Sequence, residues 1–199
     1  MRTLLVLVAA LAAIGSSLAA QATELRIVSY NIRHGRGMDD SVNLVRTAAV
    51  LRALQPDIVG LQEVDDRVRR SGGVDEAAGL GGALGMHHAF GAFMEYQGGQ
   101  YGMGIPSRFP ITRVIPVRLP DGNEPRIALA AELLLPDSSA LVVVNVHFDW
   151  VADDAFRFAQ ATALTRFLDA LPGPYVLLGD FNDEPGSRTL ALFQQRAAE

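Results

Sequence analysis

Two residue types are missing from this 199-residue sequence, which contains no cysteine and no lysine. The lack of cysteine excludes disulfide bonds, cysteine-ligated zinc, iron–sulfur clusters and a thiol nucleophile. The lack of lysine excludes a Walker A phosphate-binding loop, a Schiff base and Ser-x-x-Lys catalysis. All 17 basic side chains are therefore arginines, and the formal net charge is −5. This balance disfavours a protein that clamps long stretches of nucleic acid, because such proteins usually present a basic face.

The first 22 residues have the pattern of a secretory signal peptide. Arg2 supplies a positive charge, residues 4–14 form an unbroken apolar run, and residues 20–22 (Ala-Gln-Ala) fit the rule for signal-peptide cleavage. The apolar run is too short to cross a bilayer. We therefore expect an exported protein, periplasmic or secreted, without a stable membrane anchor. The alternatives are a buried N-terminal helix and an uncleaved anchor.

The remaining residues, 23–199, have the length of a single domain and contain more strands than helices. Residues 39–41 (Asp-Asp-Ser) are expected to cap the first helix. Because the strands come in adjacent pairs rather than alternating with helices, we expect an α/β fold in which two packed sheets are flanked by helices. The periodicity predicts strands over 24–32, 57–63, 87–93, 101–106, 111–119, 126–135, 140–148 and 175–180, and helices over 44–54, 74–84, 156–167 and 187–197.

Polar side chains stand at the carboxyl ends of several apolar strands: Asn31, Glu63, His147 and the pair Asp180 and Asn182. Such positions are costly for a polar group without a partner, and strand ends that meet at one rim form a ligand crevice. Two carboxylates with two amides suit Mg²⁺ or Mn²⁺, which prefer oxygen ligands. Such an ion polarises phosphoryl oxygens, so phosphate-ester hydrolysis is the expected reaction class.

Each of these residues also has a simpler interpretation. Glu63 is equally consistent with a solvated turn residue. Asp180 and Asn182 are typical turn formers, and His147 is consistent with a hydrogen-bonded histidine of the core. The combination of all of them points to a site, because their joint occurrence at strand ends is hard to explain separately.

Six segments of the sequence carry a family resemblance. They occur in the order 28–35 (VSYNIRHG), 58–64 (IVGLQEV), 101–111 (YGMGIPSRFPI), 124–126 (EPR), 144–149 (VNVHFD) and 178–185 (LGDFNDEP). Together they resemble the successive motifs of the endonuclease/exonuclease/phosphatase family of metal-dependent hydrolases. The resemblance covers about residues 24–188.

This resemblance implies a four-layer α/β sandwich and a divalent cation, Mg²⁺ or Mn²⁺. The implied substrate is a phosphorylated small molecule, a phospholipid headgroup or a nucleic acid. The implied metal ligands are Asn31, Glu63 and Asp180, and the implied catalytic residues are His147, Asp180, Asn182 and Tyr101. In this interpretation His147 contacts the scissile phosphate, Asp180 and Asn182 orient the attacking water, and Tyr101 bonds the phosphate. Tyr101 and Arg126 match weaker positions of the family pattern, and Arg126 is equally consistent with a structural role.

The sequence departs from the family pattern mainly at its end. The family closes with further strands and a Ser-Asp-His element, whereas seventeen residues follow Asn182 here and none is histidine. We therefore expect residues 23–199 to form a family-like domain that lacks its final strands, with impaired activity. The alternatives are a non-catalytic module that binds a metal or a phosphorylated ligand, and an unstable fragment of a hydrolase.

Overall fold

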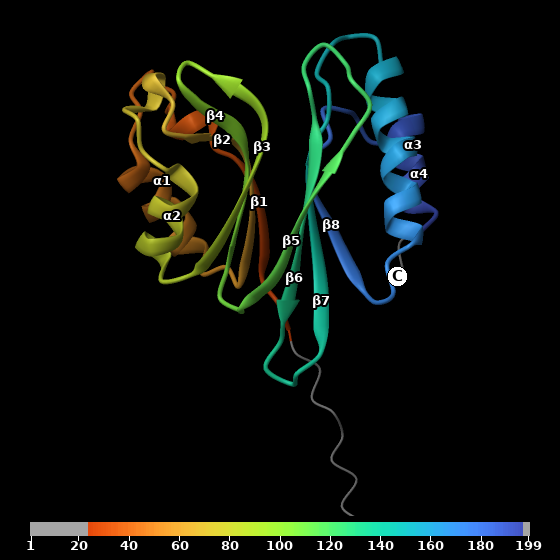
Figure 1. Ribbon diagram of the computed structural model, residues 1–199, viewed down its shortest axis with the longest axis horizontal. Helices are drawn as coiled ribbons and strands as arrows, with labels where there is room; N and C mark the ends of the chain where they lie inside the picture. Colours follow the sequence, from red (N-terminus) through yellow and green to blue (C-terminus); the bar gives the residue numbers. More distant parts are fainter. Residues whose placement is uncertain (1–23, 197–199) are drawn as a thin grey trace, which may run out of the picture.

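The computed structural model of the protein describes residues 24–196 (Figure 1). The signal peptide expected over residues 1–22 lies outside the described residues and stays a prediction. Over residues 24–196, no helix is long and apolar enough to cross a membrane.

Every helix and strand expected within residues 24–196 forms, with small shifts of its ends. The strands are β1 (Ile27–Asn31), β2 (Ile58–Asp66), β3 (His87–Tyr96), β4 (Gly99–Ser107), β5 (Ile111–Arg118), β6 (Ile127–Leu134), β7 (Ala140–His147) and β8 (Tyr175–Asp180). The helices are α1 (Leu44–Leu54), α2 (Glu76–Leu84), α3 (Ala155–Asp169) and α4 (Arg188–Gln194), with short 3-10 turns η1 (Arg33–Gly35) and η2 (Arg69–Ser71).

The elements are stacked in four layers. Figure 1 shows α1 and α2 on the outer face of one sheet, α3 and α4 on the outer face of the other, and the two sheets facing each other between them. The strand orders are β1-β2-β4-β3 and β5-β6-β7-β8. The two packed mixed sheets flanked by helices confirm the expected α/β sandwich.

Each sheet contains one parallel pair of strands. β1 runs parallel to β2, with Asn31 opposite Gln62, and β7 runs parallel to β8, with His147 opposite Asp180. The other neighbours in both sheets are antiparallel. The carboxyl ends of parallel strands meet at one edge of a sheet, so β7 and β8 bring His147 and Asp180 together. The pairing of β1 with β2 places Asn31 beside Gln62, the residue before Glu63.

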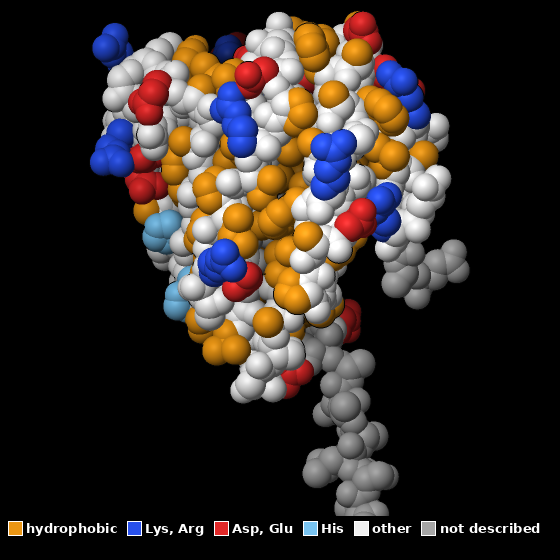
Figure 2. Space-filling view, turned by 45° about the vertical axis from the view of Figure 1, so that its right-hand side comes forward, with side chains coloured by type: hydrophobic (Ala, Val, Ile, Leu, Met, Phe, Trp, Pro, Cys, Tyr) orange, Lys and Arg blue, Asp and Glu red, His pale blue; other side chains and the backbone are white. Residues whose placement is uncertain are grey.

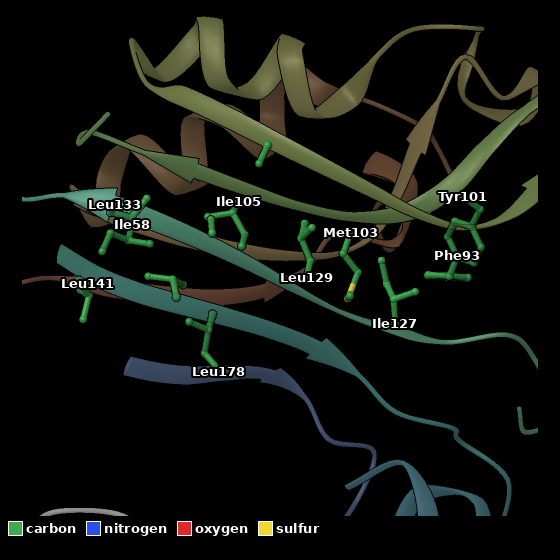
Figure 3. Close-up of a cluster of buried hydrophobic side chains, with 13 residues drawn as sticks. Ile58, Phe93, Tyr101, Met103, Ile105, Ile127, Leu129, Leu133, Leu141 and Leu178 are labelled. Carbon is green, nitrogen blue, oxygen red and sulfur yellow. The ribbon is translucent and has the colours of Figure 1, made fainter. Parts of the chain in front are cut away.

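The main core fills the space between the two sheets. Its buried members come from strands of both sheets, and Figure 3 shows them pointing toward one another: Ile58, Phe93, Tyr101, Met103, Ile105, Ile127, Leu129, Leu133, Leu141 and Leu178. Full burial of one such aliphatic side chain contributes about 1.5–3 kcal/mol. Two smaller clusters bind α1 and α2 to the first sheet, and α3 and α4 to the second. The apolar runs of the sequence thus hold the two sheets in a fixed relation.

The cap expected at residues 39–41 is wrong. Asn43 caps α1, because its side-chain oxygen accepts a 3.0 Å hydrogen bond from the backbone N–H of Arg46. The carboxylate of Asp39 instead accepts hydrogen bonds of 2.9 and 3.1 Å from the guanidinium of Arg46. The residue immediately before the helix is the one placed to meet the free N–H groups of the first turn.

Candidate active site

The expected site residues lie at one rim of the sandwich. Asn31, His147 and Asp180 are the last residues of β1, β7 and β8. A cleft of about 290 Å³ opens there, and its lining is mainly polar. It is lined by Glu63, Tyr101, Glu124, Arg126, His147, Trp150, Asp180 and Asn182. The structure therefore brings together residues that are widely spaced in the sequence.

One amide connects the two sheets at this rim. The Nδ2 of Asn31 donates hydrogen bonds to Glu63 Oε1 at 2.9 Å and to Asp180 Oδ2 at 3.1 Å. Its Oδ1 accepts a 3.1 Å bond from the backbone N–H of Arg33. Glu63 belongs to one sheet and Asp180 to the other, so two carboxylates from different sheets converge on a single nitrogen.

The sequence suggested that Glu63 ends its strand, and this prediction is wrong. β2 continues to Asp66, and Glu63 lies at an irregularity where the register against β4 shifts between Leu61 and Val64. The backbone of Glu63 has a φ of 56°, in the left-handed region that side chains other than glycine seldom adopt. A bulge of this kind re-aims a side chain within an otherwise regular strand. It gives Glu63 a direction that strand alternation alone would not predict.

His147 lies between a cation and an acid. Its Nδ1 is 3.4 Å from Nη1 of Arg126, and its Nε2 is 4.0 Å from Asp180 Oδ2. Because a guanidinium only donates, Nδ1 carries the lone pair and the proton of the neutral ring is on Nε2. Burial, reinforced by the charge of Arg126, lowers the pKa of His147 to about 4 against the opposing effects of Asp180 and Glu63. The ring is therefore a neutral donor directed at Asp180.

Arg126 does more than support the structure. Only 1% of it is exposed, and its guanidinium reaches Glu124 Oε2 at 3.0 Å as well as His147. It also lies 5.1 Å from the ring centre of Phe93. This buried cation sets the tautomer of His147 and lies in the wall of the cleft.

Tyr101 is enclosed on several sides where β4 borders the cleft. Its ring packs edge-on against Phe93 at 4.8 Å, and the guanidinium of Arg70 lies 4.7 Å from its centre. Burial, with a smaller effect of Glu63, raises the pKa of the Tyr101 hydroxyl far above its ordinary value. The hydroxyl stays protonated and is available as a hydrogen-bond donor.

Asn182 is fixed by its own loop. Its backbone N–H donates to Asp180 Oδ1 at 3.0 Å, and its Nδ2 donates to the carbonyl of Phe148 at 2.8 Å. Its φ of 49° is again left-handed. Asn is one of the residues that adopt this conformation most readily, which explains an Asn at this turn.

Sequence reasoning assigned no role to two residues that line the cleft, Glu124 and Trp150. Glu124 belongs to a motif segment, and its pairing with the buried Arg126 was not apparent from the sequence. Trp150 follows the 144–149 motif directly, but nothing in the local pattern tells which way a loop side chain faces.

A larger hollow, of about 600 Å³, lies elsewhere, along β8 and α4. Its lining is largely apolar and includes Tyr175, Val176, Leu177, Phe181 and Phe193. It contains none of the carboxylates or histidines described above. The chemistry of the smaller polar cleft makes that cleft the candidate active site.

The donor set of the cleft fits a hard divalent cation. Glu63 and Asp180 offer carboxylate oxygens within 3.1 Å of the Asn31 Nδ2 that donates to both, and a divalent cation near them would offset their like charges. The part of the chain that the structure describes has no group of three or more His, Cys, Asp or Glu side chains placed to hold a metal. The two carboxylates and the Asn31 amide are therefore the residues that would hold such an ion, with water as its other ligands.

The chain belongs to the Endonuclease/Exonuclease/phosphatase family, whose model matches residues 28–199. An endonuclease/exonuclease/phosphatase from Beutenbergia cavernae superimposes with a TM-score of 0.66 at 26% identity, over 83% of this chain and 50% of that chain. An endonuclease/exonuclease/phosphatase family protein from Bacteroides thetaiotaomicron superimposes with a TM-score of 0.70 at 20% identity, over 88% of this chain and 70% of that chain. ANGEL2, a 2′,3′-cyclic phosphatase, superimposes with a TM-score of 0.67 at 20% identity, over 86% of this chain and 57% of that chain.

The family consists of hydrolytic enzymes, and the fold of this chain is theirs. The chain spans about half the length of the Beutenbergia protein that it matches.

Proposed function

We propose that this protein is a divalent-metal-dependent phosphoester hydrolase with Mg²⁺ or Mn²⁺ as its cofactor. The observation that carries the proposal is the convergence of Glu63 and Asp180, from different sheets, on the amide of Asn31. When bound there, a divalent cation polarises a phosphoryl oxygen and makes bound water more acidic. Family membership and the similarity to ANGEL2, a 2′,3′-cyclic phosphatase, support the reaction class.

The side chains of the cleft have distinct parts in this proposal. His147 carries its proton on Nε2 and donates it in a hydrogen bond to an oxygen of the phosphate, while Arg126 holds the ring in that tautomer. The protonated hydroxyl of Tyr101 is a second donor to the phosphate. Asp180 accepts a proton from the attacking water as the water oxygen bonds to phosphorus, and the ester oxygen leaves as an anion with the electrons of the broken P–O bond. Asn182, tied to Asp180 through its backbone N–H, orients that water.

The substrate is proposed to be a small phosphate ester. The net charge is −5, and on the face shown in Figure 2 the Arg side chains stand apart, several with an acidic side chain beside them. A continuous basic track, which a long polyanion would need, is not formed on that face.

The test is hydrolysis of bis(p-nitrophenyl) phosphate and p-nitrophenyl phosphate with Mg²⁺ or Mn²⁺, with and without EDTA. We expect turnover that EDTA abolishes and that added metal restores. His147→Ala should lower kcat by about 10²–10³-fold, the usual cost of removing one preorganised hydrogen-bond donor to the developing charge. His87→Ala, at an exposed position of β3, is the matched control and should have no effect. Turnover that survives EDTA would contradict the proposal, as would metal and phosphate binding without turnover.

We also propose that the protein is exported, on the strength of the signal-peptide pattern of residues 1–22. Sequencing the N-terminus of the protein recovered from its native cell should find residue 23 first. A chain that retains Met1 would contradict this proposal.

A further inference from the structure

We infer that Trp150 is a stacking platform for a flat aromatic group on the substrate, so that the substrate is a nucleotide-like phosphate ester. This inference rests on the proposed function, because it assigns the part of the substrate that lies beyond the phosphate. Trp150 is a specificity-determining residue in this interpretation, and Asp149 beside it is a positioning residue.

Trp150 is an exposed residue at the cleft. It lines the cleft together with His147 and Asp180, and 59% of the residue is accessible to water. The other large hydrophobic residues that are more than one-third exposed, such as Met38 and Val45, do not line that cleft. An exposed indole at the mouth of a polar cleft is suited to binding, because it offers a large flat surface at a low entropic cost.

The backbone on both sides of Trp150 is held by buried polar groups. The Oδ1 of Asp149 accepts a 3.1 Å hydrogen bond from the N–H of Val151, and the N–H of Asp149 donates to Oε1 of Gln160 at 2.9 Å. Arg157 Nη1 donates to the carbonyls of Val151 and Asp149. Asp149 and Gln160 are fully buried. The backbone that carries the indole is thus held in place by these hydrogen bonds.

The same carboxylate also holds the loop that leads to Glu124 and Arg126, two other residues that line the cleft. Asp149 Oδ2 accepts a 2.6 Å bond from the N–H of Asn123, three residues before the buried Arg126 at the wall of the cleft. Gly122 approaches this oxygen so closely that an added Cβ would lie 2.3 Å from it. Asp149 therefore fixes the Trp150 platform relative to the polar groups that face the phosphate, which preorganises the cleft for a ligand that touches both.

The surroundings of the indole favour a flat ring over an acyl chain. The lining of the cleft is otherwise polar and charged, and Trp150 is its one exposed large apolar residue among the positions that the structure describes. An acyl chain would need a continuous apolar surface, whereas a single ring needs one face to stack on. A phosphate against His147 and Arg126 with an aromatic base on Trp150 describes a mononucleotide.

The experiment exploits the fact that Trp150 is the chain's single tryptophan. The full chain is titrated with adenosine 5′-monophosphate, ribose 5-phosphate and inorganic phosphate, with EDTA and again with Mg²⁺. Indole fluorescence is excited at the red edge of its absorption, where adenine does not absorb. We expect saturable quenching by the nucleotide, and little change with ribose 5-phosphate or phosphate.

Calorimetry on variants then measures what the indole contributes. Trp150→Ala should weaken the binding of adenosine 5′-monophosphate by at least about fivefold, the lower limit for stacking of one base on an aromatic ring. It should leave the binding of ribose 5-phosphate unchanged, and Trp150→Phe should restore most of the nucleotide affinity. Phe156→Ala removes another exposed aromatic residue, on α3 and outside the cleft, and should change neither.

Three results would overturn the inference. The first is the absence of nucleotide binding. The second is equal quenching by ribose 5-phosphate, which would indicate a platform for the sugar. The third is a nucleotide affinity that Trp150→Ala does not change. These results are independent of catalysis, because binding is measured without turnover. If p-nitrophenyl esters are hydrolysed and the nucleotide does not bind, this inference fails alone. If the nucleotide binds on Trp150 and no ester is hydrolysed, the proposed function fails.

Discussion

Gln62 of β2 and Asn145 of β7 form a 2.7 Å hydrogen bond between the two sheets, inside a layer that is otherwise mainly apolar. Both side chains are buried. Gln62 directly precedes Glu63, and Asn145 lies two residues before His147. This bond therefore ties the two strands together next to the residues that they contribute to the cleft.

Replacing Asn145 by Ala should destabilise the protein by at least about 2 kcal/mol. The Nδ2 of Asn145 also donates to the carbonyls of Leu61 at 2.8 Å and Gly104 at 3.1 Å, so the change leaves several buried groups without partners. One such group costs about 1–3 kcal/mol. Urea unfolding measures the loss, with the exposed Gln195→Ala as control. A loss below about 0.5 kcal/mol, as at an ordinary surface site, would refute a role for this bond.

Arg70 and Asp65 should behave as a buried pair that supports Tyr101. Asp65 is fully buried and accepts two bonds from Arg70, of 2.9 and 2.8 Å. Removing one partner of a fully buried pair costs about 3–5 kcal/mol. The side chain of Arg70 is one-quarter exposed, so solvent screening reduces the expected cost to below that range. Arg70→Ala should therefore lower the free energy of unfolding by about 2–3 kcal/mol.

Arg69→Ala is the matched control, since Arg69 is the exposed neighbour in the same turn η2. Chemical denaturation of both variants gives the comparison. Equal effects of the two substitutions would show that the Asp65 contact contributes nothing specific.

Glu76 should make stability fall as the pH rises. Burial raises its pKa to about 8 from an ordinary value of 4.5. Because the folded state holds the proton more tightly than the unfolded state, this contribution is complete below pH 4.5 and is lost as the pH rises through about 8. The melting temperature of Glu76→Gln, relative to that of the unaltered protein, should therefore rise as the pH increases from 4.5 to about 8.

The control for this comparison is Glu95→Gln, on the exposed part of β3. Its melting temperature should keep a constant difference from that of the unaltered protein across the same pH range. If the difference for Glu76→Gln is also constant, Glu76 does not titrate as its burial requires.

The sequence was sufficient for most of the fold because the signals were local. The helix over Leu44–Leu54 follows from its apolar spacing and from Gln55-Pro56 after it, and β8 follows from an apolar run that begins just after Pro174. The proximity of His147 and Asp180 follows from their positions at the ends of neighbouring parallel strands.

The details that the sequence did not predict depend on contacts between distant residues. The bulge that re-aims Glu63 arises where β2 pairs with β4, which no pattern within residues 57–63 reveals. The bond between Gln62 and Asn145 requires the two sheets to be placed face to face. The backbone beside Trp150 is held by Asp149, Gln160 and Arg157, which come together and become buried only after folding.

The most direct test of the central claim is calorimetric titration of the protein with Mn²⁺ and Mg²⁺. We predict one binding site, abolished or weakened at least about tenfold by either Glu63→Gln or Asp180→Asn, because each removes one of two negative ligands. Glu95→Gln should bind as the unaltered protein does. Unchanged metal affinity in both the Glu63→Gln and Asp180→Asn variants would contradict the account.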